Sequence, residues 1–201
     1  MSKFITIEAP DFTGKTTLIN GLKKELENYI FYKEPFKNYS TELNTLSELI
    51  YNKDTNKDNS FLYWLAQRNI TWNDYILPLL NNNSNIICDR FYDSTMIYQG
   101  ILQNNFTKVK QIHDLFIPNL KIDLTFYLKI DWESIKLRLE QRKINNDLDT
   151  LDNVNEAYIK TLITSYDYYF DNLRDRNVIV IDAIQEKDLV LKNVIKHLKT
   201  N

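Results

Sequence analysis

Runs of residues typical of β-strands alternate with runs typical of helices along the whole chain. The strand-like runs are rich in β-branched and aromatic residues and lie at 4–9, 30–34, 85–89, 124–130 and 178–183. Apolar residues recur at helical spacing at 15–29, 41–52, 61–80, 94–104, 107–116 and 131–142, and a last helix should follow the final strand. Parallel strands need crossover connections, usually helices. The alternation therefore predicts an α/β fold, a five-stranded parallel sheet flanked by helices in a doubly wound arrangement.

Length and composition indicate one ordinary globular domain, residues 1–201, with 43% hydrophobic and 26% charged residues. The net charge of −2 gives no basic field, so we expect no nucleic-acid partner. No apolar run approaches the roughly 18 residues that cross a bilayer, and no signal sequence precedes the first strand. The single cysteine, Cys88, lies in an apolar run and should be a buried structural thiol. We expect a cytoplasmic protein without a membrane partner.

The first strand leads directly into a loop with the composition of a phosphate-binding site. In FITIEAPDFTGKTT (4–17), Gly14, Lys15 and Thr16 follow a strand and begin a helix, which is the context that a P-loop requires. Backbone N–H groups at a helix start bind phosphate. Lys15 would neutralise the β- and γ-phosphates, and the Thr16 hydroxyl would bind Mg²⁺. Ala9 replaces the first glycine of the motif, a change that the strand end tolerates if its φ is negative.

A second polar segment, DRFYDSTMIYQG (89–100), begins where a buried strand ends. This edge of a parallel sheet is where open α/β folds bind their ligands. Asp89 could hold Mg²⁺ or a water on it, and the forked guanidinium of Arg90 could bridge two phosphates. Taken alone, the pair could equally be a surface salt bridge.

Together these segments resemble the thymidylate kinases, a family of P-loop nucleoside monophosphate kinases with a small lid. KEP (33–35) is similar to the family's Arg-Glu-Pro, and LYWLAQR (62–68) to its Leu-Leu-Phe-Ala-Ala-x-Arg. DLTFYLKID (123–131) and VIVIDA (178–183) complete the order, so the resemblance covers essentially the whole chain. It implies ATP- and Mg²⁺-dependent phosphorylation of dTMP to dTDP, with no covalent intermediate.

The resemblance also implies roles for individual residues. Those expected to act in catalysis are Asp11, Lys15, Arg90 and Arg142. Those expected to bind ATP are Phe12, Thr13, Gly14, Lys15, Thr16, Thr17, Arg138 and Arg142, and those expected to hold the metal are Thr16 and Asp89. Those expected to bind dTMP are Asp11, Lys33, Trp64, Arg68, Arg90, Ser94, Thr95, Tyr98 and Gln99. Trp64 would stack on thymine, and Arg68, one helical turn later, would hydrogen-bond the base.

The sequence departs from the family on the ATP side. Some members place an arginine in the P-loop where Phe12 stands, and others supply one from the lid, where this chain has Thr150. The polar segment 143–153 is the expected lid, and Arg142 with Lys143 is the candidate for the missing charge. An arginine on the transferring phosphoryl group can raise the rate about 10³-fold. Our hypothesis is therefore that this enzyme is slower than family members that carry the arginine, or that a different residue replaces it.

Alternatives to a thymidylate kinase stay open at this point. The chain could be a deoxynucleoside kinase, a monophosphate kinase with another base preference, or a degenerate nucleotide-binding protein. Family members commonly dimerise through helices, and segments 61–80 and 91–102 could form such a homodimer. His113 and His197 have no metal-ligand spacing, and we expect both to be exposed to solvent.

Overall fold

The computed structural model describes residues 2–52, 54–144 and 155–200, without the side chains of residues 57 and 142–144. The chain forms two compact units. The first comprises Met1–Thr6 and Asn28–Leu124, and the second comprises Ile7–Glu27 and Thr125–Asn201. None of the described helices is long and apolar enough to span a membrane.

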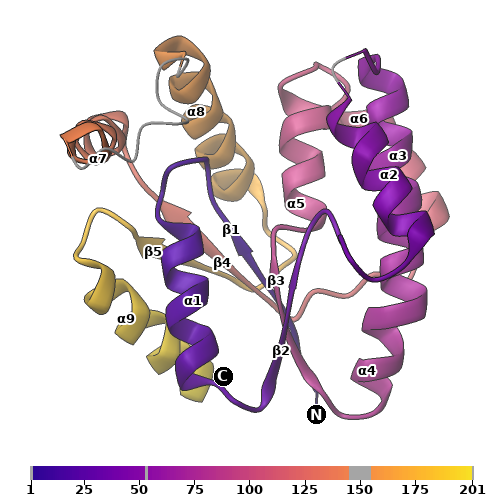
Figure 1. The fold of residues 1–201 in the computed structure, drawn as a ribbon, viewed down its shortest axis with the longest axis horizontal. Coiled ribbons are helices and arrows are strands. Elements are labelled where there is room, and N and C mark those ends of the chain that lie inside the picture. Colours follow the sequence, from indigo (N-terminus) through magenta and orange to yellow (C-terminus); the bar gives the residue numbers. More distant parts are fainter. Residues whose placement is uncertain (1, 53, 145–154, 201) are drawn as a thin grey trace. The chain divides into compact units, whose positions relative to one another are not determined.

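The strands form a five-stranded sheet in the order β2-β3-β1-β4-β5 (Figure 1). They are β1 (Phe4–Glu8), β2 (Tyr29–Lys33), β3 (Asn85–Asp89), β4 (Leu124–Lys129) and β5 (Val178–Asp182). β2 pairs with β3, and β4 with β5, in parallel. The predicted parallel sheet flanked by helices is confirmed, and each predicted strand agrees with an observed one to within one residue at either end.

The helices of the first unit are α2 (Thr41–Tyr51), α3 (Lys57–Ile70), α4 (Leu77–Asn81), α5 (Tyr92–Thr95) and α6 (Phe106–Phe116). Two π-helical segments, η1 (Thr71–Ile76) and η2 (Met96–Ile101), continue α3 and α5. The helix predicted at 61–80 begins earlier because the Asn56 side chain accepts a hydrogen bond from the Asn59 N–H at 2.8 Å and caps it. π-helical turns occur frequently at functional sites, and here they follow the segments that carry Arg68 and Thr95.

Aromatic side chains form the centre of the first unit. The Phe4 ring meets the Phe91 ring edge-on at 4.9 Å and lies 5.5 Å from that of Trp72. The Phe4 N–H also donates to the Asp123 carboxylate at 2.9 Å. These contacts fix Phe91, and hence the chain that leaves β3, against the start of β1.

The helices of the second unit are α1 (Lys15–Glu25), α7 (Trp132–Ile144), α8 (Glu156–Asn172) and α9 (Lys187–Thr200). α1 ends before its predicted end at residue 29 because Tyr29 pairs with Asn85 in the sheet. α1 packs on α9 (Figure 1), where a Cβ on Gly21 would lie 2.9 Å from the Leu191 side chain. The predicted Asp131 cap of α7 is confirmed by the Ser134 N–H, which donates to its carboxylate at 2.7 Å.

Candidate active site

The loop between β1 and α1 has the geometry that the P-loop pattern predicts. Gly14 lies at the start of α1 with φ of 88°, in the left-handed region that favours glycine. Lys15, the first helical residue, is buried, whereas Thr16 and Thr17 are exposed. Among the described residues, no side chain caps this helix start. Its N–H groups and positive dipole end therefore suit an anion.

The two unusual residues of the loop differ in their backbone. Ala9 is buried at the end of β1 and is not among the described residues with positive φ, so its replacement of glycine is tolerated as predicted. Phe12 has φ of 67°, a left-handed conformation in which its Cβ is crowded. Phe12 is therefore strained in its backbone, besides bringing no charge to the loop. Asp11 beside it is half-buried.

Hydrogen bonds to its own backbone hold the loop in shape. The Thr13 hydroxyl, which is buried, donates to the Pro10 carbonyl at 3.0 Å. Arg138 on α7 donates from Nη1 to the Thr13 carbonyl at 2.7 Å and from Nη2 to the Ala183 carbonyl. The structure thus brings Arg138 to the predicted phosphate-binding loop. Arg142 and Lys143 lie outside the described side chains, and Thr150 with most of the predicted lid lies outside the described residues.

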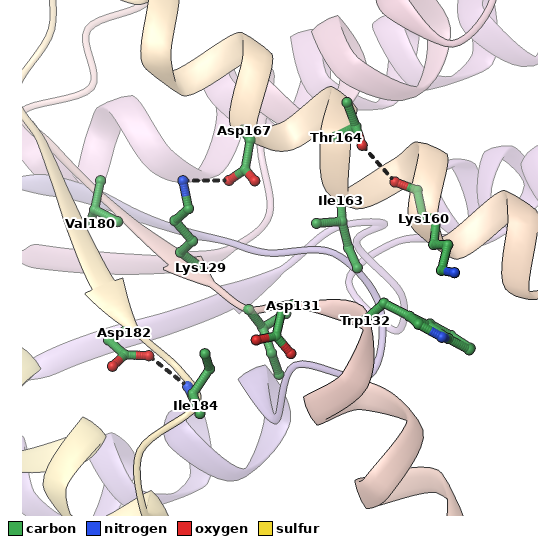
Figure 2. A pocket seen from close by; sticks show the side chains of 11 residues that line it. Lys129, Asp131, Trp132, Lys160, Ile163, Thr164, Asp167, Val180, Asp182 and Ile184 are labelled. Atoms are coloured by element: carbon green, nitrogen blue, oxygen red, sulfur yellow. Dashed lines mark hydrogen bonds and ion pairs between the residues drawn. The ribbon is translucent and has the colours of Figure 1, made fainter.

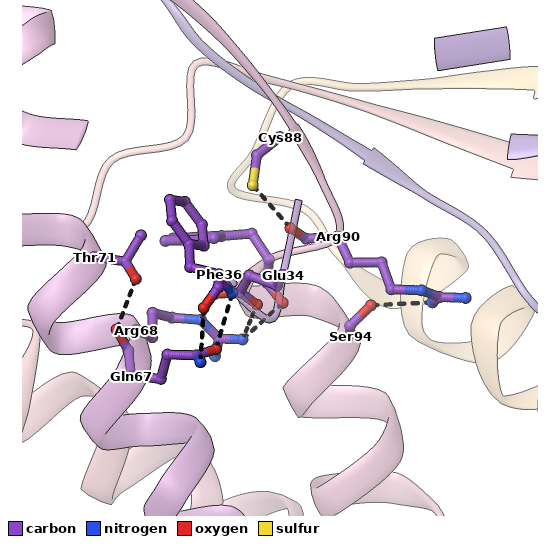
Figure 3. Close-up of polar contacts among 9 residues, drawn as sticks. Glu34, Phe36, Gln67, Arg68, Thr71, Cys88, Arg90 and Ser94 are labelled. Atoms are coloured by element: carbon purple, nitrogen blue, oxygen red, sulfur yellow. Dashed lines mark hydrogen bonds and ion pairs between the residues drawn. The ribbon is translucent and has the colours of Figure 1, made fainter. Parts of the chain in front are cut away.

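The first unit contains a buried ion pair between residues 34 positions apart. Arg68 on α3 donates from Nε to Glu34 Oε1 at 2.8 Å and from Nη2 to Oε2, and Nη2 also donates to the Phe91 carbonyl at 3.1 Å (Figure 3). Burial raises the pKa of Glu34, and the guanidinium opposes that rise. Within the described residues, Arg68 Nη1 is buried and has no hydrogen-bond partner.

That unpartnered Nη1 is the feature of Arg68 that bears on ligand binding. A buried donor without a partner is costly in a folded protein, and it would be satisfied by an acceptor on a ligand. The side chain of Trp64, one turn earlier on α3, is half-buried. The role of Glu34 was not predicted: KEP was part of the resemblance, but nothing in the sequence pairs residue 34 with residue 68.

The carboxyl ends of β2 and β3 bring a second group of predicted residues together. Lys33 is the register partner of Asp89, and the Glu34 N–H donates to the Asp89 carbonyl at 3.1 Å. Asp89 is buried, and Lys33 is exposed. Arg90 has φ of 65° and donates from Nη1 to the Ser94 hydroxyl at 3.2 Å. This edge of the sheet carries the Asp-Arg pair, as predicted.

The segment after Arg90 presents the remaining predicted residues. Ser94 and Thr95 are buried on α5, and Tyr98 and Gln99 are half-buried on η2. The Arg90 guanidinium carbon lies 5.5 Å from the centre of the Tyr98 ring, within the range of a cation–π interaction. Cys88 is fully buried, as predicted, and its thiol donates to the Arg90 carbonyl at 3.1 Å. Arg90 is thus held both at its backbone carbonyl and at its guanidinium.

The expectation for His113 is wrong. Its side chain is buried on α6, edge-on to the Tyr92 ring at 4.6 Å, and neither ring nitrogen has a hydrogen-bond partner within the described residues. Desolvation, with repulsion from Arg68 and Lys110, lowers the pKa of His113 to about 3. The imidazole is therefore neutral near pH 7. His197 on α9 is half-buried rather than fully exposed.

A groove of about 680 Å³ lies in the second unit beside β4, β5 and α8 (Figure 2). Its apolar lining consists of Ile130, Trp132, Ile163, Val180 and Ile184. Its carboxylates are engaged within the protein: Asp167, for example, accepts from Tyr127 Oη at 2.7 Å and pairs with Lys129 at 3.1 Å. Of the predicted site residues whose side chains the structure describes, none lines this groove.

A strand that leads through a glycine–lysine–threonine loop into a helix, on a parallel sheet, defines a P-loop nucleotide-binding protein. Comparison with known proteins identifies the family. The model of the thymidylate kinase family matches residues 7–194. The chain is 34% identical over 208 residues to a thymidylate kinase of Mycoplasmopsis pulmonis, covering 98% of this chain and 87% of the relative. It is 30% identical over 204 residues to a thymidylate kinase of Ligilactobacillus salivarius, covering 98% of this chain and 97% of the relative. The chain belongs to the thymidylate kinase family.

Proposed function

We propose that this protein transfers the γ-phosphoryl group of ATP to dTMP and releases dTDP and ADP. Membership of the family supports the reaction and its acceptor, and the observation that carries the binding of a base is Arg68. Its guanidinium is fixed by Glu34 and Phe91 and leaves one buried donor for an acceptor atom such as a base carbonyl. Trp64 on the same helix would cover the face of that base.

The donor nucleotide would bind the loop that precedes α1. The backbone N–H groups of Gly14 to Thr17 would hold its phosphates, and Lys15 would neutralise the charge that moves to the bridging oxygen. Thr13 and Phe12 belong to the same loop, and Arg138 would support it through the Thr13 carbonyl. Phosphoryl transfer depends mostly on positioning and charge neutralisation, so the reaction needs no covalent intermediate.

A magnesium ion would be held by oxygen donors, which this chain offers at two predicted positions. The Thr16 hydroxyl is exposed at the start of α1, and the Asp89 carboxylate ends β3. Hydroxyl, carboxylate and phosphate oxygens are the ligands that Mg²⁺ prefers, and it commonly takes only one or two from the protein. When bound, the ion would neutralise the β- and γ-phosphate oxygens.

The acceptor monophosphate would bind the residues that the resemblance to the family implies for it. Arg90, oriented by Ser94 and Tyr98, would clamp its phosphate, with Lys33 as a second cation. Asp11 would bind near the sugar 3′-hydroxyl. The remaining substrate-binding residues would be Thr95 and Gln99, with Tyr98 excluding a ribose 2′-hydroxyl.

One cation of the catalytic set has no assigned position. Phe12 and Thr150 stand where some family members carry an arginine. We propose that Arg142, with Lys143, supplies only part of the missing charge from beside the lid segment at 143–153, which leaves a slower enzyme.

We also propose that residues 1–201 form a single kinase domain, because the family match spans residues from both compact units. We further propose that the protein is cytoplasmic and that it forms a homodimer through the helices of the first unit.

The reaction is tested by incubating the purified chain with Mg²⁺-ATP and dTMP, dUMP or thymidine in parallel. Products are separated chromatographically, so that dTDP is distinguished from dTMP formed from thymidine. The proposal predicts dTDP as the main product and far slower turnover of thymidine. Phosphorylation of thymidine alone would identify a deoxynucleoside kinase, and preference for another monophosphate would replace dTMP as the acceptor. ATP binding without turnover of any acceptor would indicate a degenerate enzyme.

A further inference from the structure

The residue before Arg68 makes an unusual set of contacts for a helical side chain. Gln67 is fully buried, and its amide bonds to the segment that follows β2 (Figure 3). Its Oε1 accepts from the Phe36 N–H at 3.2 Å, and its Nε2 lies 3.3 Å from the Phe36 carbonyl oxygen. Nε2 also donates to Ser47 Oγ at 2.7 Å and to the Leu43 carbonyl at 3.2 Å. The amide thus joins α3, α2 and the loop at residue 36.

Gln67 and Arg68 therefore hold the same short segment at two points. Arg68 holds the Glu34 carboxylate, and Gln67 holds the backbone of Phe36, two residues later. The Phe36 ring packs at 4.7 Å on Tyr32 and at 5.2 Å on Tyr39, which fixes the segment from its other side. With Phe36 fixed, the Glu34 carboxylate has a defined position relative to α3.

The position of Glu34 determines where Arg68 points its remaining donor. Nε and Nη2 are both bonded to the Glu34 carboxylate, so the planar guanidinium turns with that carboxylate and carries Nη1 with it. The Gln67 backbone is held too, because the Thr71 hydroxyl donates to its carbonyl at 2.8 Å at the start of the π-helical segment. A loosened Phe36 would let the carboxylate move, and an error of about 1 Å can markedly weaken a positioned contact.

We infer that Gln67 is a positioning residue for acceptor recognition. Through Phe36 and Glu34 it sets the direction of Arg68 Nη1, the donor assigned to the base of dTMP. This inference rests on the proposed function. Gln67 itself does not touch the substrate, so its loss should weaken dTMP binding while leaving the ATP side unchanged.

The test compares Gln67→Met, a near-isosteric side chain without the amide, with the wild-type chain. We expect the KM for dTMP to rise about tenfold while the KM for ATP changes less than about twofold. Ser47→Ala, which removes one partner of the amide, should raise the KM for dTMP by a smaller factor. Val109→Ala, a buried truncation on α6, is the control for general destabilisation and should leave both KM values unchanged.

A double-variant cycle separates positioning from a merely structural role. If Gln67 acts through Arg68, the Gln67→Met, Arg68→Met double variant should have the same KM for dTMP as Arg68→Met alone. Multiplicative effects of the two substitutions, or parallel changes in both KM values, would overturn the inference. If the wild-type chain does not phosphorylate dTMP at all, the proposed function fails first, and that outcome is visible before any variant is made.

Discussion

The Arg68 guanidinium and the Glu34 carboxylate are bonded to each other at two points, and both side chains are buried. Removing one partner would leave the other as an unpaired buried charge, which typically costs 3–5 kcal/mol, an order-of-magnitude figure. We therefore expect Arg68→Met to lower the free energy of unfolding by about 3 kcal/mol or more in urea titrations. The Glu34→Leu, Arg68→Met double variant should lose less than the two single variants combined. A single-variant loss below about 1 kcal/mol would show that the pair is not buried as described.

Phe12 should be strained by its left-handed backbone. An L-residue in this region is less stable by roughly 1–2 kcal/mol, and glycine escapes that penalty. Phe12→Gly should therefore be about 1 kcal/mol more stable than Phe12→Ala, measured by chemical denaturation. Both substitutions remove the ring, so their difference reports the backbone alone. Equal stability of the two variants would mean that residue 12 is not left-handed in solution.

His113 should make the protein less stable in mild acid. Its pKa is lowered to about 3 in the folded state from an ordinary value of 6.5, so the unfolded chain binds the proton first as the pH falls. The free energy of unfolding should therefore decrease as the pH falls from 6.5 to 3. Between pH 8 and pH 5.5, the part of this decrease that His113 causes should be about 1.4 kcal/mol. His113→Leu should abolish this part of the pH dependence, whereas His197→Leu on α9 should retain it. An unchanged slope in His113→Leu would contradict the burial of a neutral imidazole.

The sequence could have revealed the burial of His113. Val109, His113 and Ile117 follow one another at intervals of four and are all buried, so the histidine shares the apolar face of α6. The strands were predictable because short β-branched runs alternate with helical periodicity. The phosphate loop was predictable because Gly14, Lys15 and Thr16 are adjacent. The Glu34–Arg68 pair could not be predicted, since it joins residues far apart in the chain. The left-handed conformation of Phe12 could not be predicted either, since phenylalanine rarely adopts it.

Since Thr150 stands where some family members carry an arginine, replacing it with arginine should increase the activity. Thr150→Arg should restore a lid cation, and we expect kcat to rise about tenfold or more while the KM for dTMP barely changes, because an arginine on the transferring phosphoryl group stabilises the transition state. Steady-state kinetics at saturating ATP measures both constants. Thr150→Gln has a long polar side chain without the charge and should give no increase. If Thr150→Arg leaves kcat unchanged or lowers it, another residue already supplies the charge.

The most direct test that the chain phosphorylates dTMP is a competition among acceptors. The purified chain is given Mg²⁺-ATP and an equimolar mixture of dTMP, dUMP, dCMP, dAMP and dGMP, with thymidine in a separate reaction. Each product is separated by chromatography and quantified by mass spectrometry. Lys15→Met, which removes the cation of the phosphate loop, serves as the blank and should lose activity by about 100-fold or more. We expect dTDP to form fastest and thymidine to be phosphorylated far more slowly than dTMP. Faster formation of any other product, or equal activity of Lys15→Met, would contradict this expectation.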